Sequence, residues 1–149
     1  MLTSPDFREP LKLFDEHEVR YLIVGGYAVM RYAEPRFTEG LDVLIAVDAA
    51  NAAAVFAALR AFGAPLAGLT PEDFAVEGSF YQMGNPPLRV DVLMDVPGVD
   101  FAAAWPRRET VMIGDAPMHF IGKQDLIASK RAAGRSKDLL DLESLEADL

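Results

Sequence analysis

The stretch that decides the fold is residues 20–48, RYLIVGGYAVMRYAEPRFTEGLDVLIAVD. It divides into four segments, which are an apolar run at 21–24, the pair Gly25-Gly26, helix-forming residues at 27–33 and a second apolar run at 41–47. Pro35 separates the helix formers from the second apolar run, because proline cannot continue a helix. The pattern predicts a strand, a tight glycine turn, a short helix and a second strand.

The glycine pair suggests a phosphate site. Glycine at a strand-to-helix junction lets a phosphate approach the backbone, and the helix that follows offers free N–H groups and a positive dipole end. Asp42 lies in the second predicted strand, where a carboxylate can hold a divalent metal against a phosphate. Two simpler interpretations stay open: a glycine pair also serves as a plain turn, and a strand Asp also serves as a cap or at a solvated edge.

The composition predicts a single domain, residues 1–149. With 149 residues, 51% of them hydrophobic, the chain can bury about two thirds of its unfolded surface. It has no cysteine, which excludes disulfides and thiolate metal sites. Residues 1–10 lack the basic and apolar parts of an export signal, and the alanine-rich stretch 49–69 is too amphipathic for a membrane span. We therefore expect a cytoplasmic protein that does not contact membranes.

The net charge of −9 argues against broad nucleic-acid binding, because most of the surface would repel a phosphate backbone. The basic residues are unevenly spread, and five of the 14 lie close together near the C-terminus: Lys123, Lys130, Arg131, Arg135 and Lys137. Such a group is typical of a local anion site. A solvated helix face that balances acidic neighbours has the same composition, so both interpretations stay open.

The rest of the chain predicts mixed α and β structure. Helical spacing of apolar residues, with caps and glycine stops, predicts helices at 5–18, 49–62, 100–105, 123–133 and 136–149, with a short one after Thr70. Short apolar runs bounded by Gly and Pro predict two hairpins, from strands at 79–83 with 88–96 and at 109–113 with 118–121. We expect Trp105 to be a core anchor, and Leu139, Leu142 and Leu145 to form the buried stripe of the last helix.

A second acid, Asp91, lies in an apolar strand. In the predicted strand 88–96 it shares a face with Arg89, while the opposite face is apolar throughout. Asp42 and Asp91 are therefore two carboxylates in otherwise apolar strands, and a carboxylate in that setting needs a partner or a metal. Arg89 can be that partner, so the simple ion pair stays open beside the metal.

Lys130 follows the three-and-four spacing of a core-facing helix stripe, together with apolar residues on either side. An inward lysine needs an anion, although a lysine can also bury its stem and keep its charge in water. Asp138 and Asp141 lie one turn apart in the next predicted helix. These acids can bind the preceding basic residues instead of any ligand.

Taken in order, the motifs carry a family resemblance. They are Val24-Gly25-Gly26, Pro35-Arg36-Phe37-Thr38, Leu41-Asp42-Val43, Val90-Asp91-Val92, and Lys130 followed by Gly134-Arg135, Lys137-Asp138 and Asp141. The series resembles the DNA polymerase beta-like nucleotidyltransferase superfamily. Within it the chain looks most like small bacterial nucleotidyltransferases related to toxin components of type IV abortive-infection systems. The resemblance covers about residues 11–145.

The resemblance implies an α/β (α+β) fold with a mixed sheet, flanking helices and C-terminal helices packed on the sheet. It also implies a glycine turn that holds a triphosphate, and acids on two neighbouring strands that bind two Mg²⁺ or Mn²⁺ ions. On this mapping the catalytic and metal-binding acids are Asp42 and Asp91. The nucleotide-binding residues are Gly25, Gly26, Arg36, Thr38 and Lys130.

Gly40 departs from the family pattern. The sequence TEGLD stands in place of Thr-x-Asp-x-Asp, so that the first metal-binding acid is missing. Positions 40 and 42 point to the same side of a strand, whereas Glu39 points to the other side and cannot substitute. We expect weak metal binding and slow transfer. The chain is then a natural degenerate homologue, a deliberately inactivated variant, or an active enzyme with altered metal use.

Three functions follow from these observations. The first is transfer of a nucleoside monophosphate from a nucleoside triphosphate to an RNA or protein acceptor. The second is a non-catalytic nucleotide-binding or partner-binding module, for instance one that pairs with a cognate antitoxin. The third is an α/β domain without nucleotide binding, in which Arg89 and Arg36 neutralise the two strand acids.

Overall fold

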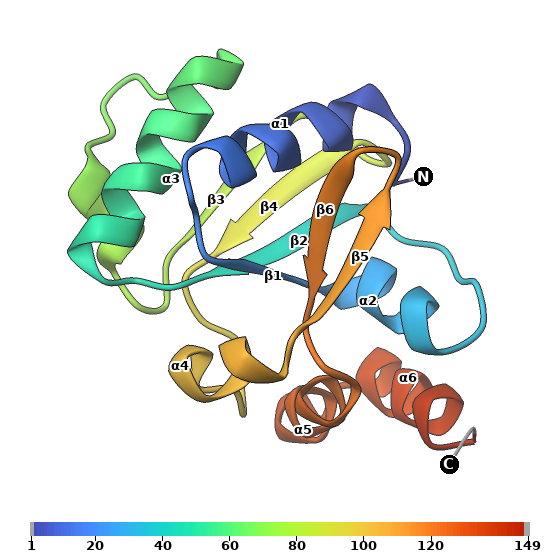
Figure 1. Cartoon of the computed structure of the whole chain (residues 1–149). Helices are drawn as coiled ribbons and strands as arrows, with labels where there is room; N and C mark the ends of the chain where they lie inside the picture. The colour runs from blue at the N-terminus through green and yellow to red at the C-terminus, as the bar shows by residue number, and fades with distance from the viewer. Residues whose placement is uncertain (1, 148–149) are drawn as a thin grey trace.

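A computed structural model describes residues 2–147 and shows one mixed six-stranded sheet (Figure 1). Its strands are β1 (Tyr21–Val24), β2 (Gly40–Ile45), β3 (Phe80–Met83), β4 (Arg89–Leu93), β5 (Glu109–Ile113) and β6 (Ala116–Phe120). They lie in the order β3-β4-β2-β1-β6-β5, with β2 parallel to β4, β1 parallel to β6 and the other pairs antiparallel. The mixed sheet and both predicted hairpins, β3–β4 and β5–β6, are confirmed.

Helices cover both faces of the sheet (Figure 1). They are α1 (Pro5–Glu16), α2 (Gly25–Tyr32), α3 (Ala49–Phe62), α4 (Phe101–Ala104), α5 (Lys123–Ala133) and α6 (Ser136–Glu146), with 3₁₀ turns η1 (Pro71–Ala75) and η2 (Trp105–Arg107). The helices α1 and α3 lie on one face, and α2, α4, α5 and α6 on the other. A first core lies between the sheet and the helices α1 and α3. A second core joins the sheet to α5 and α6 through Leu22, Leu44, Leu126, Ile127, Leu142 and Leu145. The predicted packing of the C-terminal helices on the sheet is therefore confirmed.

Local sequence signals set several helix ends. The Asp48 side chain accepts a hydrogen bond from the Asn51 backbone N–H and so caps the start of α3. Gly63 and Gly134 end α3 and α5 in the left-handed conformation, as their positions predicted. None of the helices in residues 2–147 has the length and apolar character needed to span a bilayer.

The helix after β1 begins earlier than predicted. Gly25 is its first residue, at φ +66°, so the glycine pair is the first turn of α2 and not a separate turn before it. A glycine can take this φ without steric cost, which lets the chain pass from strand to helix with no connecting residue.

The buried face of α6 also differs from the prediction. Leu139 is 55% exposed, and the buried side chains are Asp138, Asp141, Leu142 and Leu145. The helix is rotated because its acids have cationic partners inside, as described below. Residues 148–149 of the predicted helix lie outside the described residues.

The prediction that Trp105 is a core anchor is wrong. The side chain is half-buried and packs at the edge of the second core. Its ring stacks on Phe101 at 5.7 Å between centroids, and the Arg108 guanidinium carbon lies 3.8 Å from its centroid. Trp105 therefore joins Phe101 and Arg108 at the edge of the core through ring stacking and a cation–π contact.

Candidate functional site

A cavity of about 450 Å³ lies at the first residues of β2 and β4, next to the first turn of α2. Every residue predicted for the site lines it: Gly25, Gly26, Arg36, Thr38, Asp42, Asp91 and Lys130. Further residues that the sequence did not assign to the site also line it, namely Phe37, Glu39, Arg89, Ser129, Arg135, Lys137 and Asp138. The prediction that Glu39 points to the other side of the strand is wrong, because Glu39 precedes β2 and its side chain reaches Arg89. Residues from widely separated segments of the chain thus converge on one space.

Strand register brings the two acids together. The parallel strands β2 and β4 pair with Asp42 opposite Asp91 and Gly40 opposite Arg89. On the other side of β2, Asp42 is also opposite Val24, the last residue of β1. Because α2 starts directly after Val24, its first turn lies beside the two carboxylates.

The glycine pair makes room for this arrangement. A Cβ on Gly25 would lie 2.1 Å from Oδ2 of Asp42, and a Cβ on Gly26 would lie 2.7 Å from Oγ1 of Thr38. Any larger residue would push these side chains away from the start of α2. The positive end of the helix dipole stabilises a carboxylate at the start of α2. The charge of Asp42 is therefore stabilised by the same helix end that would stabilise a phosphate.

The two strand acids interact unfavourably when both are charged. The pKa of Asp42 is raised to about 6, first by burial, then by the charge of Asp91 and a hydrogen bond with its carboxyl group. The cations Arg89 and Lys130 pull this pKa downward but do not cancel the rise. The pair we call the sheet acids, Asp42 and Asp91, is therefore short of positive charge.

Arg89 is in direct contact with one of the sheet acids, Asp91. Its Nε donates to Oδ1 of Asp91 at 2.9 Å and its Nη2 donates to Oδ2 at 3.0 Å, which is a bidentate pair. Nη2 also lies 3.4 Å from Oε2 of Glu39. Hydrogen bonding to Asp91 raises the pKa of Arg89. The predicted pairing of Arg89 with Asp91 is confirmed.

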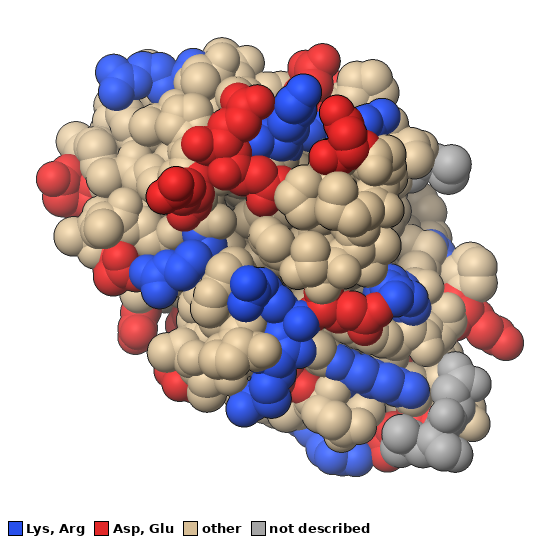
Figure 2. All heavy atoms as spheres, viewed as in Figure 1, with Lys and Arg blue, Asp and Glu red and all other residues tan. Residues whose placement is uncertain are grey.

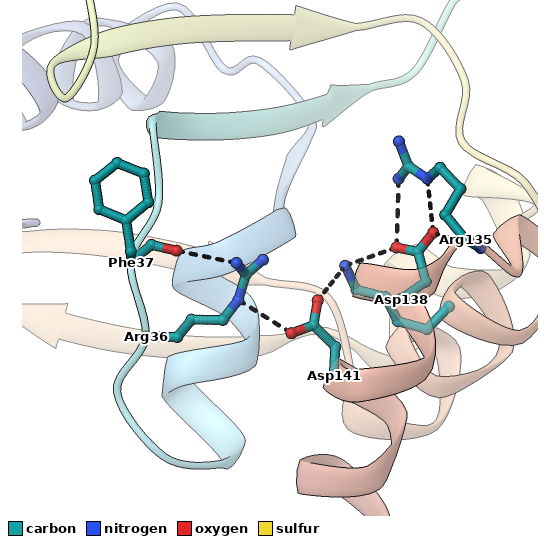
Figure 3. A network of polar contacts seen from close by, with 6 residues as sticks. Arg36, Phe37, Arg135, Asp138 and Asp141 are labelled. Atoms are coloured by element: carbon teal, nitrogen blue, oxygen red, sulfur yellow. Dashed lines mark hydrogen bonds and ion pairs between the residues drawn. The ribbon is translucent and has the colours of Figure 1, made fainter.

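The predicted pairing of Arg36 with a strand acid is wrong. Nε of Arg36 lies 3.1 Å from Oδ1 of Asp141, on α6, and its Nη1 donates to the Phe37 carbonyl at 3.0 Å (Figure 3). Sequence could not reveal this partner, because Asp141 reaches Arg36 only when α6 folds back across the loop that precedes β2.

Lys130 is buried between two acids of α6. Its Nζ lies 3.3 Å from Oδ1 of Asp138 and 2.9 Å from Oδ2 of Asp141. Arg135 closes the group, since its Nε donates to Oδ2 of Asp138 at 2.7 Å (Figure 3). We call Arg36, Lys130, Arg135, Asp138 and Asp141 the α6 network. The interpretation that Asp138 and Asp141 bind basic residues of the chain itself is confirmed.

Charge balance in the α6 network is the reverse of that at the sheet acids. Burial alone would raise the pKa of Asp138, but the hydrogen bonds from Arg135 and the charge of Lys130 outweigh burial and lower it. Asp138 is 0% exposed and stays ionised because its partners surround it. Lys130 lines the cavity, yet Asp138 and Asp141 already neutralise its charge.

Basic side chains gather on one part of the surface. In Figure 2 Lys and Arg side chains gather over the lower half of the face shown, where Figure 1 places α4, α5 and α6. Arg135 and Lys137 line the cavity, and the described contacts give Lys137 no ion pair. The cluster of basic residues near the C-terminus was the sequence signal for both.

Comparison with known proteins agrees with this fold. An antigenic nucleotidyltransferase-like protein from Paracoccidioides brasiliensis superposes with a TM-score of 0.54, at 20% identity, over 92% of this chain and 70% of that one. The fold is nucleotidyltransferase-like. No protein-family model matches the chain, and no curated protein does. The predicted fold class is confirmed, whereas the relationship to abortive-infection toxins stays a prediction.

The sequence resemblance predicts bound magnesium, and the donor set does not match a pair of ions. Within residues 2–147 no group of three or more His, Cys, Asp or Glu side chains converges as a metal site. The sheet acids supply two carboxylates, and Asp91 is already held by Arg89. At position 40, where the first acid of the family pattern is missing, a Cβ would lie 1.9 Å from the Arg89 carbonyl oxygen. The backbone itself occupies the space that an Asp would need.

Proposed function

We propose that the cavity binds the phosphates of a nucleoside triphosphate, and that the domain is a nucleotidyltransferase that moves the nucleoside monophosphate to an RNA or protein acceptor. The observation that carries this proposal is the convergence of all seven predicted residues on one cavity in a nucleotidyltransferase-like fold. A volume of about 450 Å³ also suits a ligand of nucleotide size.

The residues offer distinct contacts to such a ligand. The first turn of α2 presents backbone N–H groups toward the cavity, and Thr38 presents a hydroxyl that now donates to the Gly40 carbonyl at 3.0 Å. Lys137 adds a cation with no ion pair among the described contacts. Together these groups would hold the phosphates and fix the orientation of the phosphorus that reacts.

Asp42 is suited to proton transfer. A pKa of about 6 leaves a carboxylate that is mostly ionised at neutral pH and basic enough to take a proton from an attacking hydroxyl group. The cations that line the cavity would stabilise the charge that develops on the phosphate oxygens. The magnesium or manganese ions implied by the resemblance stay a prediction, and Asp42 and Asp91 are the carboxylates that would have to hold them.

A second candidate is a non-catalytic nucleotide-binding or partner-binding module, such as one half of a toxin–antitoxin pair. Gly40 favours it, because the missing acid cannot be placed without moving the start of β4. The close approach of the two backbones also supports a natural adaptation to glycine over a later inactivating change. A cognate antitoxin is part of this second proposal.

Transfer of label from each α-labelled nucleoside triphosphate tests the proposal. The protein is incubated with magnesium or manganese and bulk RNA, and label on the RNA and on the protein is measured beside nucleotide binding. The matched variants are Asp42→Asn in the cavity and Asp95→Asn, an exposed residue two positions after β4 that does not line the cavity. Transfer that is lost in Asp42→Asn alone supports the enzyme. Binding without transfer supports the second candidate, and absence of both overturns the proposal.

A further inference from the structure

The sheet acids lie where a divalent metal is expected, and a guanidinium group lies there instead. Arg89 belongs to the same strand as Asp91 and holds both of its oxygens. Its backbone also faces Gly40 across the β2–β4 pair, at the position of the missing acid. Two departures from a metal site, an absent ligand and an added cation, therefore occur at one point of the sheet.

We propose that the Arg89 guanidinium takes the place of the divalent metal, so that this cavity binds nucleotide phosphates without a divalent cation. The choice of ligand rests on the proposed function, whereas the exclusion of metal rests on Arg89, Asp42 and Asp91 alone.

The geometry of Arg89 leaves it free to serve a ligand. Its contacts with Asp91 and Glu39 use Nε and Nη2, and no hydrogen bond recorded among residues 2–147 uses Nη1. The side chain lines the cavity and is 26% exposed. A guanidinium that is anchored by one edge to a carboxylate can present its other N–H groups to a phosphate, for which its planar fork is well matched.

The charges around the cavity balance without a metal. Five basic side chains line it, namely Arg36, Arg89, Lys130, Arg135 and Lys137, against four acidic ones, namely Glu39, Asp42, Asp91 and Asp138. Asp141, which contacts Arg36 and Lys130, brings the acids to five, so positive and negative charges balance when every acid is ionised. A metal would have to displace Arg89 from Asp91 before it could bind both sheet acids.

Gly40 makes this substitution hard to reverse. A Cβ at position 40 would meet the carbonyl oxygen, carbonyl carbon and Cα of Arg89 at 1.9, 2.8 and 3.1 Å. These are backbone atoms, so they cannot rotate away as a side chain would. A Gly40→Asp change therefore disturbs the strand pair and does not simply restore a third ligand.

Titration with Mn²⁺, followed by electron paramagnetic resonance, tests the exclusion of metal without any nucleotide. We expect the wild-type protein to show no saturable Mn²⁺ site in the millimolar range. We expect Arg89→Met to create a saturable site whose affinity for Mn²⁺ is about tenfold or more above any residual wild-type binding, because the ion pair with Arg89 no longer competes for Asp91. The matched control is Arg107→Met, because Arg107 holds Asp125 in the same bidentate way at 3.0 and 2.8 Å outside the cavity.

Two results would overturn the exclusion of metal. One is a Mn²⁺ site in the wild-type protein that disappears in Asp91→Asn. The other is an Arg89→Met protein that remains folded by circular dichroism and still gains no site. If Arg89→Met does not fold, the wild-type and Asp91→Asn titrations decide the question by themselves.

Nucleotide binding supplies the second arm. Labelled ATP is titrated into the wild-type protein in EDTA and in excess magnesium. We expect the two affinities to agree within about threefold, which is less than the tenfold difference that corresponds to about 1.4 kcal/mol. In EDTA, Arg89→Met should lose about tenfold or more and Arg107→Met should not change. A wild-type affinity that requires magnesium contradicts the proposal. Absence of ATP binding in every condition contradicts the proposed function. The Mn²⁺ titration still tests separately whether Arg89 excludes a metal.

Discussion

The protein contains two pairs of neighbouring acids, and their surroundings differ in one respect. Asp138 and Asp141 on α6 are in contact with three basic side chains, so the α6 network has more positive than negative charge. Asp42 and Asp91 on the sheet have Arg89 alone in direct contact among the described residues. The pKa of Asp138 is accordingly lowered, whereas that of Asp42 is raised.

This difference separates a structural role from a binding role. A buried acid with its full set of cations has no capacity left for a ligand, and it fixes the elements that carry the charges. The α6 network ties α5 and α6 to the loop before β2, which contains Arg36 and Thr38. The negative charge of the sheet acids is not fully neutralised by the protein, so a further cation or a proton would stabilise them. Acids in such surroundings concentrate at functional sites.

Removing the central cation of the α6 network should have the largest effect. Lys130→Met leaves Asp138 and Asp141 buried with fewer partners, so we expect the free energy of unfolding to fall by about 3–5 kcal/mol. Urea denaturation at neutral pH measures this change. The control is Lys123→Met in the first turn of the same helix, where the side chain is half-buried and the described contacts show no ion pair. Equal losses in the two variants would show that the network does not act as a structural unit.

Filling the space at Gly40 should have the next largest effect. Gly40→Ala places a Cβ against the Arg89 carbonyl, and we expect a loss of about 1–3 kcal/mol from overpacking between β2 and β4. Gly78→Ala is the comparison, because its Cβ meets no atom within 4 Å and the change tests the cost of φ +83° alone. If thermal unfolding shows Gly40→Ala to be the milder change, the backbones at β2 and β4 are not in close contact.

The sheet acids should give the protein a pH-dependent stability. Between pH 3.8 and about 6 the folded protein keeps the Asp42 proton that the unfolded chain has lost, so this contribution to stability falls as pH rises. Asp42→Asn cannot ionise, and its stability relative to wild type should rise by about 2 kcal/mol between pH 4 and pH 7. Urea denaturation at several pH values measures the difference. A rise of the same size in Asp95→Asn would remove the assignment to Asp42.

The outer contact of the α6 network should contribute least. The Arg36 side chain is 33% exposed and Asp141 keeps Lys130 as a partner, so Arg36→Met should cost about 1 kcal/mol or less. A double-mutant cycle with Asp141→Asn isolates the coupling of the two side chains. A coupling as large as the loss in Lys130→Met would mean that Arg36, and not Lys130, is the main counter-ion.

Sequence predicted the local elements of the site well. The order of apolar run, glycine pair and helix formers predicted β1 and α2, and strand alternation placed Asp42 and Asp91 on faces that could meet. Spacing predicted the inward position of Lys130. Each of these inferences uses a pattern that is repeated within a few residues along the chain.

The pairing of charges could not be predicted in the same way. The phase of α6 depends on Lys130 from the previous helix, which draws Asp138 inward and leaves Leu139 at the surface. The contact at Gly40 depends on the parallel register of β2 with β4, which places the Arg89 carbonyl opposite. Both are properties of segments that meet after folding.

Mapping of ATP binding on backbone amides by ¹⁵N–¹H NMR tests the central claim most directly, namely that the sheet acids and the first turn of α2 form the ligand site. Titration in EDTA should shift the amide signals of Gly26, Thr38 and Asp91, which line the cavity, and leave that of Gly63 at the end of α3 in place. Shifts confined to other regions, or none at saturating ATP, would contradict the account and leave the sheet acids without a ligand.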